Sequence, residues 1–252
     1  MAGRSNIEWT EVTWNPTIGC SKVSEGCKYC YAEKWAYMQQ KRGLRDYENG
    51  FRFQLMEDRI NQPYTWKKPK IVFVNSMSDI FHEGISLEYL KNIFQVMNST
   101  PQHTYQLLTK RTDRLKELYS LLEWGENIWM GVSVESNKYL GRIDVLRQTP
   151  AKIKFISFEP LLEQITSLNL SKIDWVIVGG ESGGNARPIK TEWVDTIKES
   201  CKNSSTPFFF KQWGKTLFNP DQTDPTINKN HQYHSRGGCL INGEIFRELP
   251  IN

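Results

Sequence analysis

From residue 71 onward, short apolar runs alternate with longer amphipathic stretches along the chain. The runs consist of β-branched or aromatic residues, and several of them contain almost no polar position. Such runs are typical of parallel strands that are covered on both faces. The sequence therefore predicts strands at residues 71–74, 105–108, 128–134, 153–158, 175–178 and 207–210.

Between these runs, apolar residues recur at the spacing of an amphipathic helix. Residues 87–97 place five of them on one face, and the stretches 112–122, 136–148 and 191–203 have a similar pattern. Strands that alternate with helices of this length predict βαβ units and a parallel sheet. The expected fold class is α/β, a partial or complete (β/α) TIM-type barrel, with an open doubly wound sheet as the alternative.

Two parts of the chain differ in composition. Residues 1–214 carry the strand and helix pattern, with a further strand expected near a cysteine-rich loop, and should form the barrel domain. Residues 215–252 are polar and rich in turn-forming residues, and end in a small β element at residues 239–249. We expect this segment to be an irregular extension that packs on the barrel.

Composition and charge narrow the function classes only slightly. The 252 residues contain neither an apolar run of roughly 18 residues nor the apolar core of a signal peptide, so we expect a soluble, cytoplasmic protein without a membrane partner. The net charge of +4 is mildly basic, and basic clusters occur at residues 66–70 and 109–114. This balance permits a nucleic-acid partner without requiring one, because ordinary solvated loops have the same composition.

Polar residues follow each predicted strand where it ends. In barrels of parallel strands the loops at these ends build the active site. The glycines of the stretch 179–188 allow close backbone approach to an anion or cofactor, although a tight turn explains them equally well. By strand position alone, we expect cofactor contacts from Glu159, Gly179, Gly180 and Glu181, and substrate contacts from Arg187, Lys211 and Gln212.

Three of the five cysteines, Cys20, Cys27 and Cys30, are spaced C-x6-C-x2-C with no fourth cysteine beside them. In a reducing compartment, clustered thiols indicate a metal more often than a disulfide. A zinc site would need a fourth ligand from elsewhere, such as His82, and a redox pair would leave Cys20 unexplained. The third interpretation is an iron–sulfur cluster on three thiolates, which leaves one iron open to a ligand.

The segment from Asn15 to Ala32, NPTIGC…GCKYCYA, resembles the cluster loop of the radical S-adenosylmethionine (SAM) superfamily, in particular its spore photoproduct lyase branch. It departs from that motif in having six residues rather than three between the first two cysteines. The stretches SMSDIFHE, LLTKR and VSVES are similar to later loops of the same branch, so the resemblance covers residues 15–160. The whole chain is similar to a phage- and prophage-associated family of radical-SAM-like three-Cys-motif proteins.

The resemblance implies a four-iron, four-sulfur (4Fe–4S) cluster on the three cysteines, with SAM on the open iron. Reductive cleavage of SAM would then act on a nucleic acid or nucleotide, with a flavodoxin- or ferredoxin-type electron donor. The alternatives are a SAM-dependent transferase that releases no free radical, and a non-catalytic, zinc-stabilised nucleic-acid-binding protein. The implied ligand contacts are Tyr29, Ser78, Asp79, Lys110, Ser133 and Glu135, and Cys239 is the candidate hydrogen donor.

Overall fold

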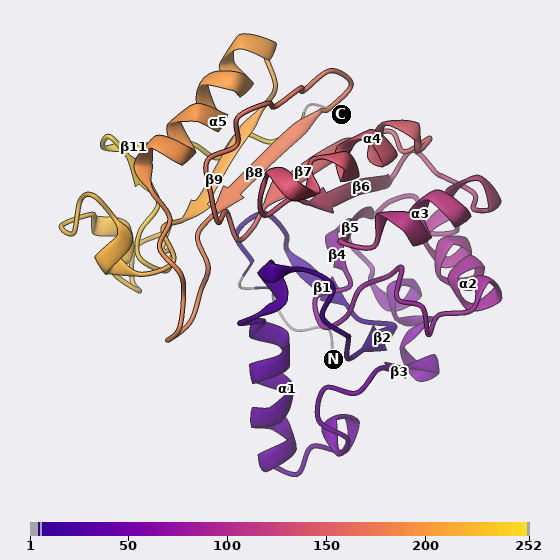
Figure 1. The fold of residues 1–252 in the computed structure, drawn as a ribbon. Coiled ribbons are helices and arrows are strands. Elements are labelled where there is room, and N and C mark those ends of the chain that lie inside the picture. The colour runs from indigo at the N-terminus through magenta and orange to yellow at the C-terminus, as the bar shows by residue number, and fades with distance from the viewer. Residues whose placement is uncertain (1–4, 6, 251–252) are drawn as a thin grey trace. The chain divides into compact units, whose positions relative to one another are not determined.

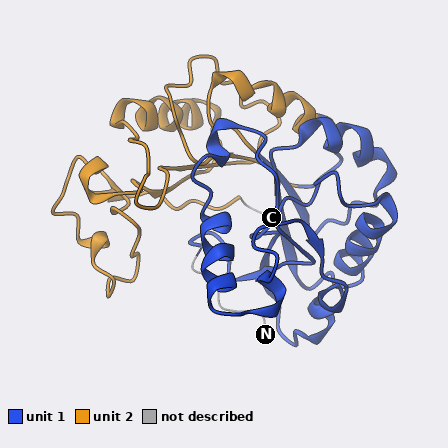
Figure 2. Ribbon diagram, turned by 60° about the horizontal axis from the view of Figure 1, so that its bottom comes forward, with its two compact units in different colours: residues 1–132, 148–152 blue, residues 133–147, 153–252 orange. Residues whose placement is uncertain are grey.

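The computed structural model describes residue 5 and residues 7–250, and it divides into two compact units (Figure 2). The first unit comprises residues 1–132 and 148–152, and the second comprises residues 133–147 and 153–252. Each unit contains parallel strands with helices in the connections.

In the first unit, β1 (Val12–Trp14), β4 (Ile71–Val74), β5 (Thr104–Thr109) and β6 (Ile128–Ser133) follow one another in parallel order (Figure 1). The last residue of β6, Ser133, is counted with the second unit. A two-stranded antiparallel ribbon of β2 (Thr17–Ile18) and β3 (Gln54–Leu55) completes the strands of the unit. Its helices are α1 (Tyr31–Lys41), α2 (Leu87–Asn98) and α3 (Thr112–Leu118).

Helix α2 shows why the apolar spacing predicted these elements correctly. Its first turn is capped by Ser86, whose hydroxyl accepts a hydrogen bond of 3.2 Å from the amide of Tyr89. The side chains of Leu90, Ile93 and Met97 lie on one face and are almost completely buried. Burial of this apolar face stabilises the helix more than its intrinsic propensity does.

In the second unit, β7 (Lys154–Phe158), β8 (Trp175–Gly179) and β9 (Phe208–Gln212) are parallel neighbours. The unit also contains α4 (Gly141–Gln148), whose last residue is counted with the first unit, α5 (Thr191–Ser204) and the antiparallel pair β10 (Leu240–Ile241) and β11 (Glu244–Ile245). Every residue of β8 is buried, as its apolar sequence predicts for a strand covered on both faces. Short 3-10 turns occur in both units, at Glu25–Cys27, Arg45–Tyr47, Glu57–Arg59, Gln62–Thr65, Tyr119–Leu121, Asn137–Tyr139, Thr216–Phe218 and Pro225–Ile227.

The predicted fold class is confirmed: this is an α/β protein of parallel strands and connecting helices, consistent with a partial TIM-type barrel. All six predicted runs contain a strand, and the predicted C-terminal β element is the β10–β11 pair. The domain boundary predicted at residue 214 stays a prediction. Among the described residues, no helix combines the length and apolar character that crossing a bilayer would require.

Candidate functional site

The cysteine loop is held by backbone contacts on both sides. Gly19 adopts a positive φ of 77°, and a Cβ atom there would lie 2.2 Å from the carbonyl oxygen of Arg52. The amide of Gly19 donates to the carbonyl of Met77 at 2.9 Å, and the amide of Cys20 donates to that of Phe51 at 3.3 Å. Only glycine fits this close approach, so the backbone fixes where the first cysteine begins the loop.

The three thiols of the loop are half-buried, and none forms a disulfide. Burial raises the pKa of Cys20 to about 11, against the opposing effect of Arg111. Burial also raises the pKa of Cys30, while the amides of Glu33 and Ala32 at the start of α1 act in the opposite direction. The charge of Cys27 raises the pKa of both other thiols. Cys27 therefore lies close enough to affect the ionisation of both Cys20 and Cys30.

Two predicted ligand contacts, Ser78 and Asp79, lie directly beside this loop in the turn after β4. The hydroxyl of Ser78 donates to the carbonyl of Gly19 at 2.6 Å. The buried carboxylate of Asp79 accepts from the Thr109 hydroxyl at 2.7 Å and from the Lys110 amide at 3.0 Å. The structure thus brings Ser78, Asp79 and Lys110 together with the cysteine loop at the carboxyl ends of β4 and β5.

A buried arginine, Arg111, connects the same segments and was not singled out from the sequence. Its Nη2 atom lies 3.6 Å from the sulfur of Cys20 and donates to Ser21, while its Nη1 atom forms an ion pair with Glu83. In the sequence, Arg111 was only part of the basic cluster at residues 109–114, whose composition is also that of ordinary solvated loops. The aromatic ring of Tyr29, another predicted contact, lies beneath the ammonium groups of two neighbouring lysines.

In the second unit, a fully buried carboxylate follows β6. Glu135 accepts from Nη1 of Arg142 at 2.9 Å, and the same nitrogen donates to the carbonyl of Ser133 at 2.7 Å. The guanidinium carbon of Arg142 also lies 4.1 Å from the ring centre of Tyr139. Helix α4 therefore fixes Ser133 and Glu135, two of the predicted ligand contacts.

A second polar cluster joins the carboxyl ends of β7, β8 and β9. The ammonium of Lys211 lies 2.8 Å from Oε1 of Glu159, and the hydroxyl of Ser157 donates to Oε2 of Glu159 at 3.0 Å. A Cβ atom on Gly179 would lie only 3.0 Å from Glu159. The absence of a side chain at Gly179 thus leaves room for this pair.

The remaining predicted residues have partners within the second unit. Arg187 donates to both carboxylate oxygens of Glu181, at 2.9 and 2.6 Å, in a bidentate pair. The side chain of Gln212 donates to the carbonyl of Gly180 at 3.1 Å. The thiol of Cys239 is buried among residues of the extension. The predicted substrate and hydrogen-donor roles of these residues stay predictions.

Comparison with known protein families identifies the family of this chain. Residues 4–250 match the family described as "Protein of unknown function (DUF5131)". The chain belongs to this family. Searches of curated proteins and of solved structures found no significant match.

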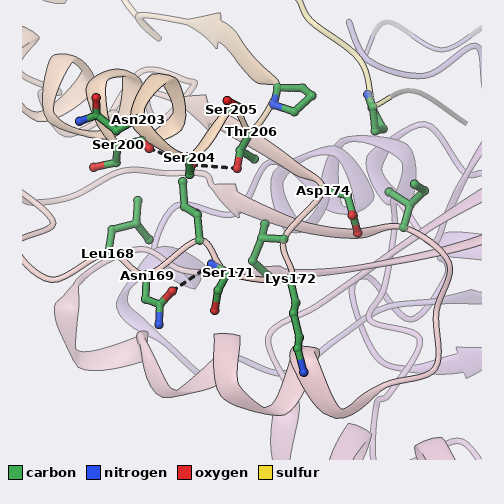
Figure 3. Close-up of a pocket in the computed structure, with 15 residues that line it drawn as sticks. Leu168, Asn169, Ser171, Lys172, Asp174, Ser200, Asn203, Ser204, Ser205 and Thr206 are labelled. Carbon is green, nitrogen blue, oxygen red and sulfur yellow. Dashed lines mark hydrogen bonds between the residues drawn. The ribbon is translucent and has the colours of Figure 1, made fainter.

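A groove of about 930 Å³ lies at the opposite, amino-terminal ends of β7, β8 and β9 in this DUF5131 chain (Figure 3). Two pairs of its polar groups bind each other: the hydroxyls of Ser204 and Thr206 are 2.9 Å apart, and the amide of Ser171 donates to Asn169 at 2.9 Å. No predicted site residue lines it. In barrels of parallel strands, this end contributes to stability rather than to chemistry.

The cysteine loop fits an iron–sulfur cluster in its donor chemistry. It offers three thiols without disulfides from one short segment, with a buried arginine beside Cys20 and with Cys27 close enough to raise the pKa of the other two. Across the described residues, no three His, Cys, Asp or Glu side chains are gathered into a metal-binding group. The chain therefore supplies the ligand types, and binding of a cluster would bring the sulfurs together.

Proposed function

We propose that this protein is a radical SAM-type iron–sulfur enzyme that acts on a nucleic acid or nucleotide. Cys20, Cys27 and Cys30 would hold a 4Fe–4S cluster. The observation that supports this proposal best is a loop of three thiols without disulfides, held beside Ser78 and Asp79 at the carboxyl ends of β4 and β5. When bound, the cluster and SAM supply the one-electron and hydrogen-abstraction chemistry, while the chain binds and positions them.

The chain's own residues have separate tasks in this proposal. Asp79 anchors the backbone of Lys110, so that the ammonium group can pair with the carboxylate of SAM. By the same resemblance, Ser133 at the end of β6 would contact the ribose, with Glu135 two positions further along the chain. The Glu159–Lys211 pair presents opposite charges at the ends of β7 and β9, where it can bind a polar group of the substrate.

A zinc site completed by His82 is the main competing interpretation. The imidazole is near the loop, because its Nε2 atom lies 3.4 Å from the hydroxyl of Ser21. However, the amide of Gly84 donates to its Nδ1 atom at 3.0 Å, which makes Nδ1 the acceptor and leaves the proton on Nε2. Zinc binding through Nε2 would move this proton to Nδ1 and break the hydrogen bond from Gly84, which disfavours His82 as the fourth ligand of a zinc site.

The test is metal and sulfide analysis of protein purified without exposure to oxygen. We expect about four irons and four sulfides per chain, lost in Cys27→Ala and retained in Cys201→Ala, whose thiol lies in the core outside the loop. Stoichiometric zinc without sulfide in the wild-type protein would refute the proposal. With SAM and a reductant, 5′-deoxyadenosine is the expected product, whereas products of methyl or aminocarboxypropyl transfer would favour the transferase alternative.

A separate variant tests the proposed contact between Lys110 and SAM. Lys110→Ala should weaken SAM binding while cluster content stays unchanged. Removing one partner of a desolvated charge pair costs about 2–5 kcal/mol, or roughly thirty-fold and more in affinity. The matched control is Lys116→Ala, an exposed lysine on α3. Calorimetry that finds equal affinity in the two variants would remove Lys110 from the SAM site.

A further inference from the structure

We propose that Arg111 is a positioning residue that holds the sulfur of Cys20 and makes the bound cluster easier to reduce. The inference rests on the proposed cluster on Cys20, Cys27 and Cys30. Its basis is the place of one guanidinium group, whose side chain is only 3% exposed, against a predicted cluster ligand.

The backbone around Arg111 is fixed at the end of β5. The amide of Arg111 donates to the hydroxyl of Thr109 at 2.9 Å, and that hydroxyl donates in turn to Asp79 at 2.7 Å. The arginine therefore leaves the strand from a defined position, just before α3 begins at Thr112.

One nitrogen of the guanidinium group binds the cysteine loop. Nη2 lies 3.0 Å from the carbonyl oxygen of Ser21, 2.8 Å from its hydroxyl and 3.6 Å from the sulfur of Cys20. These acceptors belong to two adjacent residues, so the arginine fixes both the path of the loop and the direction of the first sulfur. A lysine has no planar array of donors with which to reproduce this arrangement.

The other side of the guanidinium group faces two carboxylates. Nη1 pairs with Glu83, whose side chain is 63% exposed, and Nε lies 3.9 Å from Oδ2 of Asp79. The cation is permanent because an arginine does not lose its proton in proteins. The net positive charge near the sulfur of Cys20 therefore depends on how strongly Glu83 and Asp79 neutralise the guanidinium group.

These contacts predict the direction of an electrochemical effect. A cluster on three thiolates gains negative charge when it is reduced. Hydrogen bonds to its sulfurs and nearby positive charge stabilise the reduced form and raise the reduction potential. Arg111 supplies both, so its loss should shift the potential to more negative values, and loss of the Glu83 charge should shift it to more positive values.

The experiment measures the midpoint potential, cluster content and melting temperature of reconstituted Arg111→Gln, Arg111→Lys and Glu83→Gln. Arg114→Gln is the control, since this arginine of α3 pairs with Glu117 instead of the cysteine loop. We expect a negative shift in Arg111→Gln, a smaller negative shift in Arg111→Lys, a positive shift in Glu83→Gln and none in Arg114→Gln.

The outcomes separate this inference from the proposed function. A wild-type protein that binds no iron and sulfide contradicts the proposed function itself. A wild-type cluster together with unchanged potentials in Arg111→Lys and Glu83→Gln overturns the role of Arg111, even if cluster content falls. That pattern would mean that the arginine only stabilises the loop. Because Glu83 is exposed, Glu83→Gln should fold like the wild type. Its potential therefore tests the inference even if Arg111→Gln does not fold.

Discussion

Arg142→Met tests whether the buried ion pair after β6 stabilises the second unit. The side chains of Glu135 and Arg142 are 0% and 8% exposed, and the substitution would remove the Arg142 cation from the buried Glu135 carboxylate. The carbonyl of Ser133 would lose a donor at the same time. Removing one partner of a buried pair typically costs about 3–5 kcal/mol, because the remaining charge stays desolvated. We therefore expect a loss of that size in the free energy of unfolding.

The control is Lys152→Ala, which breaks the ion pair with Glu126. That pair is shorter, 2.7 Å against 2.9 Å, but its side chains are 53% and 84% exposed. If distance determined the energy, Lys152→Ala would be the more damaging change. Because water screens exposed charges and hydrates them when they are separated, we expect no measurable effect.

The assay is urea unfolding followed by tryptophan fluorescence, with the same slope required for wild type and variants. The double variant Glu135→Gln/Arg142→Met should recover part of the loss, because it also removes the buried carboxylate charge. A loss below about 1 kcal/mol in Arg142→Met, or equal losses in Arg142→Met and Lys152→Ala, would refute the reasoning.

Three further predictions concern the second unit. Gly180→Ala should lower stability by about 1–3 kcal/mol, because its Cβ would lie 2.4 Å from the Trp213 carbonyl oxygen, whereas Gly184→Ala meets no atom within 4 Å and should melt like wild type. Burial opposes ionisation of Asp224, but hydrogen bonds from Thr226 and other donors outweigh it and lower its pKa below the usual 3.8. Stability from Asp224 is thus present above that value and lost as the pH falls through the lower folded pKa; acid unfolding curves of Asp224→Asn should lack this loss. Burial raises the pKa of Cys201 to about 12, so mass spectrometry should find it unmodified by iodoacetamide until the protein unfolds.

The Gly180 prediction also separates two roles for the glycine-rich stretch. If Gly180 serves only its close approach to Trp213, Gly180→Ala should lower stability and SAM cleavage together. If it also approaches a ligand, cleavage should fall further than stability accounts for. Equal melting temperatures for Gly180→Ala and Gly184→Ala would show that the backbone relaxes around the added methyl group.

Local patterns were sufficient for the elements of the fold. The apolar run of β8 predicted a strand buried on both faces, and the spacing around Val194, Ile197 and Cys201 predicted the buried face of α5. Both follow from the fixed periods of strands and helices, 2 and about 3.6 residues. The sequence alone also determined that three thiols belong to one loop, since neighbours along the chain cannot lie far apart in space.

Contacts between distant segments were decided only by the tertiary structure. Cys20 and Arg111 are 91 positions apart, and no local pattern distinguishes Arg111 from its solvated neighbours in the basic cluster. Likewise, the sequence suggested a substrate contact for Arg187, and only the structure identifies Glu181 as its partner within the chain. A polar residue at a strand end is predictable because strands end in loops. Its partner depends on the register of neighbouring parallel strands and on which charges become buried together, and these are properties of the folded chain alone.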